Sequence, residues 1–142
     1  MGADTLDYCG IIPKDLATGA LWPQIGALIA AAMPYGRGEY DLDDIRAGID
    51  RNEMFAVGCV NARAEVEFVV TCCIVTFPQK QVLYIQYGAG RGGARAKDAL
   101  IAAAKTLECD WIETRCRESV ASLFRHAGFD DAYRVCILEV SL

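Results

Sequence analysis

The hydrophobic positions of the chain change their spacing near residue 54. Residues 21–33 and 41–49 carry apolar side chains three and four positions apart, which is typical of amphipathic helices, and Asp41 is placed to cap the second. The runs MFAVGCV, VEFVVTCCIVTF and QVLYIQY are rich in β-branched and aromatic residues and are separated by short polar connections. They predict three consecutive antiparallel strands. A further edge strand is expected at residues 8–12.

A glycine-rich turn follows the third strand. Beyond it, apolar residues recur with helical period over residues 96–107, and DWIETRC (110–116) indicates another strand. A short helix is expected over residues 119–127, with Gly128 at its C-terminal end, and a final strand over residues 132–140. The strands at 82–87 and 110–116 are connected through a helix and should therefore be parallel. The whole order predicts one α+β domain, residues 1–142, with a mixed, mostly antiparallel twisted sheet flanked by helices.

Composition narrows the classes of function. The chain has 142 residues, 54% of them hydrophobic, and a net charge of −5, which argues against a nucleic-acid surface. It contains no apolar run of membrane-spanning length and no basic-then-apolar start typical of a secretory signal, so we expect a cytoplasmic protein. Seven cysteines without a C-x-x-C pair, and one histidine, predict reduced thiols and no metal site.

The glycine turn allows two interpretations. Residues 88–93, GAGRGG, satisfy the spacing G-x-G-x-x-G between a strand and a helix, which is the fingerprint of dinucleotide binding. That fingerprint normally opens a βαβαβ series, whereas this turn follows an antiparallel meander. In either interpretation the turn directs backbone N–H groups and the positive end of a helix dipole to one place, which suits a phosphate.

The second interpretation is a resemblance to the GNAT superfamily of acyl-CoA-dependent N-acyltransferases. Its pyrophosphate motif, R/Q-x-x-G-x-G/A, is similar to residues 91–96, RGGARA, with Ala94 in place of the inner glycine. Its second signature, N-x-x-A-x-x-L-Y-x-x-x-G-F, is similar to residues 117–129, where Leu123, Gly128 and Phe129 agree and Phe124 replaces the tyrosine. The segments LWP (21–23), GEY (38–40) and LDDI (42–45) also resemble a divergent branch found in phages and prophages.

The resemblance implies a function and a set of binding residues. It implies an opening where the strands at 82–87 and 110–116 splay apart, with acetyl-CoA as co-substrate and an unidentified amine as acceptor. The residues that it assigns to coenzyme A are Ile85, Tyr87, Gly88, Gly90, Arg91, Gly92, Gly93, Ala94, Arg95 and Ala96. No nucleic acid or membrane partner is expected, and a homodimer is kept as an option.

The sequence defines the catalytic residues less well than the residues assigned to coenzyme A. Alternation along the strand places Tyr84 on one face and Ile85 and Tyr87 on the other. Glu113 is the candidate base, although a surface ion pair with a neighbouring arginine or lysine is the competing interpretation, and Glu67 on the long hairpin could also meet an amine. Phe124 cannot donate a proton, so water or another tyrosine would have to serve as the acid; Tyr87 and Tyr133 are the candidate substitutes, and Tyr84 is a further candidate catalytic residue. A non-catalytic protein with the same fold is the alternative function.

Overall fold

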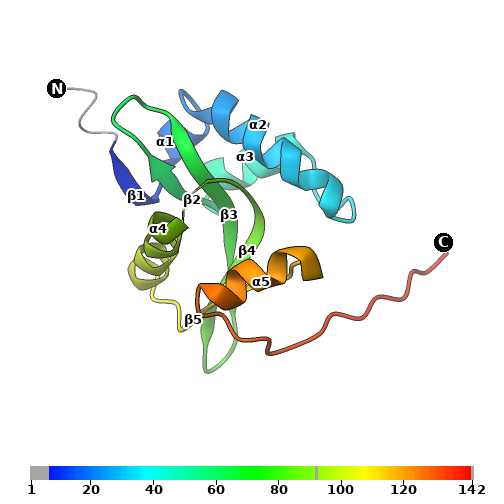
Figure 1. Ribbon diagram of the computed structural model, residues 1–142. Helices are drawn as coiled ribbons and strands as arrows, with labels where there is room; N and C mark the ends of the chain where they lie inside the picture. Colours follow the sequence, from blue (N-terminus) through cyan, green and yellow to red (C-terminus); the bar gives the residue numbers. More distant parts are fainter. Residues whose placement is uncertain (1–6, 92, 142) are drawn as a thin grey trace.

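The computed structural model describes residues 7–91 and 93–141 (Figure 1). The N-terminal half contains the strand β1, the helices α1, α2 and α3, and a short 3₁₀ helix, η2; the strands β2, β3 and β4 follow, then α4, β5 and α5. Their bounds are β1 Tyr8–Ile11, α1 Lys14–Ala17, α2 Trp22–Ala32, η2 Met33–Tyr35, α3 Leu42–Asp50, β2 Phe55–Val60, β3 Val66–Thr76, β4 Gln81–Gly90, α4 Gly93–Thr106, β5 Trp111–Thr114 and α5 Glu118–His126.

The five strands form one open sheet in the order β1-β2-β3-β4-β5. The first three pairings are antiparallel, and short connections join β2 to β3 and β3 to β4, whereas α1, α2, η2 and α3 lie between β1 and β2. β4 pairs with β5 in parallel through α4. The prediction of an α+β domain with a mixed, mostly antiparallel sheet is confirmed. The topology contains one parallel pair and no βαβαβ series among the described residues, so the dinucleotide interpretation of the glycine turn is wrong.

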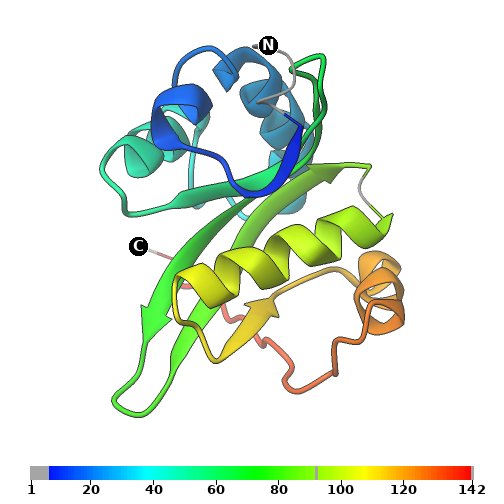
Figure 2. The same cartoon turned by 90° about the vertical axis from the view of Figure 1, so that its left-hand side faces the viewer.

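Helices cover both faces of the sheet (Figures 1 and 2). On one face α1, α2 and α3 enclose a cluster that includes Ile25, Ile29 and Ile45, all fully buried. On the other face α4 presents Ala99, Leu100 and Ala103 to the interior strands, as its periodicity predicts. Burial of these apolar side chains is the main source of stability for a domain of this size.

Two predicted helix ends are confirmed by their hydrogen bonds. Asp41 and Asp44 form a capping box at the start of α3, in which each side chain accepts a hydrogen bond from the other residue's backbone N–H. At the end of α5, Gly128 has φ +104°, and the N–H of Phe129 donates to the carbonyl of Phe124. This is the Schellman arrangement, which a glycine adopts without steric cost.

The predicted strand over residues 132–140 is not formed. Residues 129–141 have no regular secondary structure, and residues 130–141 are exposed throughout. β5 is also shorter than expected and ends at Thr114, before Arg115, Cys116 and Arg117 lead into α5. The pattern of residues 132–140 favours a strand, but a strand requires a neighbour that completes its hydrogen bonds. Within the part of the chain that the structure describes, no helix is both long and apolar enough to cross a membrane.

Candidate functional site

The two halves of β4 have different neighbours. Residues 82–85 pair with β3 on one side and with β5 on the other, and the pairing with β5 ends at Ile85 and Thr114. β4 continues to Gly90, paired with β3. From residue 86 to residue 90, its other edge has no strand partner among the described residues. The predicted splay between the fourth and fifth strands therefore takes the form of a free strand edge.

A β-bulge lies where this free edge begins. Ile85 is opposite Cys72 and Tyr87 is opposite Thr71, so Gln86 is an extra residue in β4. The backbone N–H of Tyr87 donates to Oγ1 of the fully buried Thr71, at 3.3 Å. The bulge turns Tyr87 to the α2 side of the sheet, where it joins the core below that helix, whereas Ile85 packs on the α4 side. The prediction that these two residues share a face is wrong because strict alternation ignores the extra residue.

The glycines of the turn allow β4 to approach β3 closely. A Cβ atom at Gly90, where φ is +107°, would lie 2.4 Å from the carbonyl oxygen of Glu67. At Gly88 it would lie 2.8 Å from a methyl group of Val70. The N–H of Arg91 donates to the Glu67 carbonyl at 2.7 Å, so this amide already has a partner within the chain. Gly92, which is also assigned to coenzyme A, lies outside the described residues.

The N-terminus of α4 lies directly after this turn. α4 begins at Gly93, and the N–H groups of its first turn, including those of Ala94 and Ala96, have no carbonyl acceptor one turn earlier in the helix. They form the positive end of the helix dipole. Arg91 and Lys97 are exposed beside it, and neither forms an ion pair within the described part of the chain.

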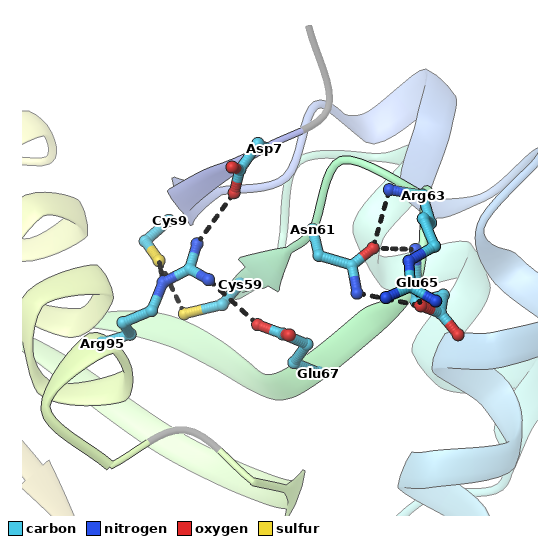
Figure 3. Close-up of polar contacts among 8 residues, drawn as sticks. All are labelled: Asp7, Cys9, Cys59, Asn61, Arg63, Glu65, Glu67 and Arg95. Carbon is cyan, nitrogen blue, oxygen red and sulfur yellow. Dashed lines mark hydrogen bonds and ion pairs between the residues drawn. The ribbon is translucent and has the colours of Figure 1, made fainter. Parts of the chain in front are cut away.

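Arg95 points elsewhere (Figure 3). Its guanidinium group donates to Glu67 at 3.0 Å, to Asp7 at 3.3 Å and to Cys9 Sγ at 3.1 Å. Two carboxylates therefore compensate its charge, and its side chain connects α4 to β1 and β3. The sequence offers no signal for this cluster, because Asp7, Cys9 and Glu67 meet Arg95 only through the strand register.

The same cluster holds a pair of thiols (Figure 3). Cys9 and Cys59 are opposite each other on β1 and β2, and their Sγ atoms are 2.8 Å apart. All seven cysteines are free in the structure. Burial, together with the adjacent Cys9, raises the pKa of Cys59 to about 12, so it is a neutral thiol at physiological pH.

A group of tyrosines lies on the α2 side of the free edge. The rings of Tyr40 and Tyr87 are in edge-to-face contact with centroids 6.2 Å apart, and Gln86 donates to the Tyr40 hydroxyl at 3.3 Å. Burial raises the pKa of both Tyr84 and Tyr87, so both phenols retain their protons at neutral pH. The backbone N–H of Arg37, 2.6 Å from Glu39, lowers the pKa of that nearby carboxyl group. Glu39 and Tyr40 belong to the GEY segment noted in the sequence, but nothing there assigned them to the site, because they come from a loop far away along the chain.

The structure brings Glu113 and Tyr84 together and leaves Tyr133 apart. Glu113 on β5 is directly opposite Tyr84 on β4, and the indole N–H of Trp111 donates to its carboxylate at 3.2 Å. The guanidinium group of Arg115 stacks on the Tyr84 ring, 5.5 Å from its centroid. Tyr133 is 83% exposed and lines a hollow beside Trp111, near the other end of β5. It therefore does not meet the free edge.

The structure also shows the contacts of Phe124 and whether metal-ligating side chains converge. Phe124, in place of the signature tyrosine, packs against the core below α4 and makes an edge-to-face contact with Phe129. In the described residues, no group of three or more metal-ligating side chains converges on one point.

Comparisons with known proteins identify the fold. No family model matches the chain, and no curated protein matches it. Among solved structures, an aminoglycoside acetyltransferase from an uncultured soil metagenomic sample is 10% identical, with 98% of both chains covered and a TM-score of 0.70. The aminoglycoside 6'-N-acetyltransferase of Acinetobacter baumannii is 13% identical, with 93% of this chain and 96% of that one covered and a TM-score of 0.64.

A protein described as a transcriptional regulator, from Bacillus halodurans, is also similar. It is 14% identical, with 94% of this chain and 100% of that one covered and a TM-score of 0.66. At such identities the likeness concerns the arrangement of the backbone. None of these comparisons tests the proposed branch of phages and prophages, which stays a prediction. The free edge of β4, the helix that follows it and these likenesses together show that the chain has the GNAT fold.

Proposed function

We propose that the protein is an N-acetyltransferase that transfers the acetyl group of acetyl-CoA to an amine. The observation that carries the proposal is the free half of β4, residues 86–90, which leads directly to the N-terminus of α4. An extended molecule with amides at one end and a diphosphate at the other fits a strand edge followed by a helix N-terminus. The topology and the likeness to acetyltransferase structures support the proposal independently.

The binding residues divide into two groups. In this proposal, backbone groups of the bulge and the free edge, from Gln86 to Gly88, hydrogen-bond an extended chain of amides, except the N–H of Tyr87, which already donates to Thr71. The first-turn N–H groups of α4, with the side chains of Arg91 and Lys97, are placed to hold an anionic diphosphate. The Arg95 side chain is left out of this group, because Glu67 and Asp7 already compensate its charge.

The reaction needs a proton acceptor for the amine and a proton donor for the leaving thiolate. Bound acetyl-CoA supplies a thioester carbonyl carbon, which the amine nitrogen attacks. Glu113, adjacent to Tyr84 across the β4–β5 pair, is the proposed base, held in place by the Trp111 indole. Tyr87 is the proposed acid, because it lies at the free edge and its phenol is protonated at neutral pH. Tyr133 has no role in this arrangement.

A non-catalytic function is the second candidate. Phe124 cannot donate a proton, and the similar protein from Bacillus halodurans is described as a transcriptional regulator. In that case the free edge would bind coenzyme A without turnover. The two candidates differ in one measurement, the release of free thiol from acetyl-CoA in the presence of amines.

The proposal is tested by calorimetric titration with coenzyme A. Ala94 is exposed in the first turn of α4, where an acidic residue favours the helix and opposes a bound anion. We expect Ala94→Asp to weaken binding about tenfold or more, because it places a charge against the diphosphate. Ala102→Asp, at an exposed position later in the same helix, is the matched control and should change the affinity less than about twofold.

Three outcomes separate the candidates. Binding that weakens in Ala94→Asp, together with thiol release across a panel of primary amines, supports the enzyme. The same binding without thiol release supports the non-catalytic protein. Absence of binding, or equal binding by both variants, overturns the assignment of the anion site to α4.

A further inference from the structure

The segment of residues 130–141 exposes a concentration of apolar side chains. Its large apolar residues are between 55% and 90% exposed: Tyr133, Val135, Ile137, Leu138 and Val140. Soluble proteins seldom expose so many neighbouring apolar groups unless the surface binds something. The segment leaves α5 and runs past the β5 end of the sheet without joining it (Figures 1 and 2).

The same segment has the residues of a strand and lacks a strand's hydrogen bonds. Tyr133, Val135 and Ile137 alternate with Arg134 and Cys136, and residues of these first three types favour strands. Within the described part of the chain, no backbone–backbone hydrogen bond involves residues 130–141. Exposed backbone groups of this kind can be paired by a neighbouring strand.

The complementary feature is the open edge of β5. β5 is the last strand in the sheet order, and among the described strands its partner is β4. Trp111, at its start, is 41% exposed. A hollow of about 380 Å³ opens beside it, lined by Phe77, Pro78, Gln79, Lys80, Trp111 and Tyr133. An exposed sheet edge next to apolar side chains is a site for strand addition.

We propose that two copies of this chain associate through these two features, with residues 132–140 of each copy adding as a strand to the β5 edge of the other. Each copy carries one unpaired segment and one open β5 edge. In a symmetric pair, the segment of each copy pairs with the β5 edge of the other, so the same contact is made twice and both segments and both edges are paired. A different protein would complete one feature and leave the other exposed. The exchange therefore forms a closed dimer.

Charge favours a second copy at this place. The whole chain carries −5, which opposes association between copies, but residues 132–141 contain one arginine and one glutamate, so their charges sum to zero. Little holds the segment against its own chain. Two ion pairs connect residues 130–141 to the rest of the domain, one between Arg37 and Glu139 and one between Arg125 and Asp131. Both are on the surface. Exposed ion pairs of this kind are easily exchanged.

The experiment measures the mass of the full chain by light scattering after size exclusion, over a range of concentrations. We expect a dimer for the parent protein. Val135→Lys with Ile137→Lys should raise the dimer dissociation constant at least about 30-fold, because two charges enter the apolar face of the added strand. Ile101→Lys, at an exposed position on α4, is the matched control and should remain dimeric. Far-ultraviolet circular dichroism verifies that each variant is folded.

A second measurement identifies which copy donates the strand. Thr114→Cys in a Cys116→Ser background places a thiol on β5 that a short, flexible bis-maleimide can join to the exposed Cys136. Crosslinked dimers on a denaturing gel support the exchange, whereas crosslinked monomers show that the segment returns to its own β5 and overturn it. A monomeric parent protein, or a dimer unaffected by the double lysine variant, also overturns the proposal.

Discussion

The sheet ends in two strands of four residues each, β1 on one side and β5 on the other, with different surroundings. β1 is contacted by α4, and Arg95 of that helix binds Asp7 and Cys9 next to it (Figure 3). In β5, Trp111 is 41% exposed, and the strand-like segment after α5 passes the strand without pairing. The two edges thus have the same length, but α4 contacts β1 more extensively than it contacts β5.

This difference shows that strand length alone does not decide whether a sheet edge is closed. The β1 edge is covered by the side chain of Arg95, which is 86 residues from Cys9 in the sequence. Such a cover opposes the addition of another strand. The β5 edge lacks such a cover in the described chain. We infer that association completes the second edge, whereas packing within one chain completes the first.

The largest effect on stability is expected from adding a methyl group at Gly58 of β2, where β2 packs closely against β3. Gly58 and Gly10 are opposite each other, but a Cβ at Gly58 would lie 2.1 Å from the Phe68 carbonyl oxygen, and one at Gly10 would meet nothing within 4 Å. Gly58→Ala should lower the free energy of unfolding by about 3 kcal/mol because β3 must shift. Gly10→Ala should cost about 1 kcal/mol, from its φ of +147°. Urea unfolding measures both.

Equal losses in the two glycine variants would contradict the tight packing of β2 against β3. They would also mean that the edge and the interior of the sheet respond alike to an added methyl group. The comparison requires that both variants fold, which circular dichroism checks.

An intermediate effect is expected from pH, through the thiol of Cys59. Its pKa is about 12 in the folded protein and about 8.5 in an unfolded chain. Below pH 8.5 both states hold the proton, and between about 8.5 and 12 the unfolded state loses it first, so stability falls as pH rises. The slope from this group approaches about 1.4 kcal/mol per pH unit.

The measurement is the free energy of unfolding of the parent protein and of Cys59→Ala between pH 8 and about pH 10. The variant should show a shallower decline, although Cys72, whose pKa is also raised by burial, still contributes. Cys136→Ala, an exposed position, is the control and should keep the parent slope. Parallel curves for parent and Cys59→Ala would contradict the prediction.

The smallest effect is expected from removing the cover of the β1 edge. Arg95→Gln loses the ion pairs with Glu67 and Asp7, which are partly exposed. We expect amide hydrogen exchange of β1 to accelerate about threefold, with little change in β5, because the contact acts locally. Arg63→Gln, whose contact with Glu65 is 3.9 Å long and highly exposed, serves as the control. Unchanged exchange in β1 would show that Arg95 does not protect this edge.

Much of the fold could be predicted from local patterns. The stripe Ala99, Leu100, Ala103 indicated the buried face of α4, and Asp41 and Gly128 indicated helix ends, because each depends on neighbours a few residues away. The antiparallel order of β2, β3 and β4 followed from short connections. The segment 132–140 was predicted as a strand and is not one, because its pairing partner is not a local property.

The candidate site was predictable in position but not in detail. The glycine turn and the following helix located it, and the resemblance to the GNAT superfamily assigned it a ligand. The bulge at Gln86 could not be predicted, since it depends on how β4 fits Thr71 of β3, and it moved Tyr87 to the other face. Arg95 was assigned to the ligand but contacts Cys9 and Glu67, because two strands bring these groups together.

The sequence by itself determined the elements, their order and the place of the glycine turn, since these depend on periodicity and on short connections. Tertiary structure decided which groups meet: the free half of β4, the partners of Arg95, and the position of Tyr133 away from the site. Contacts between distant residues depend on strand register and on bulges, and a shift of one residue reverses the face of every side chain that follows.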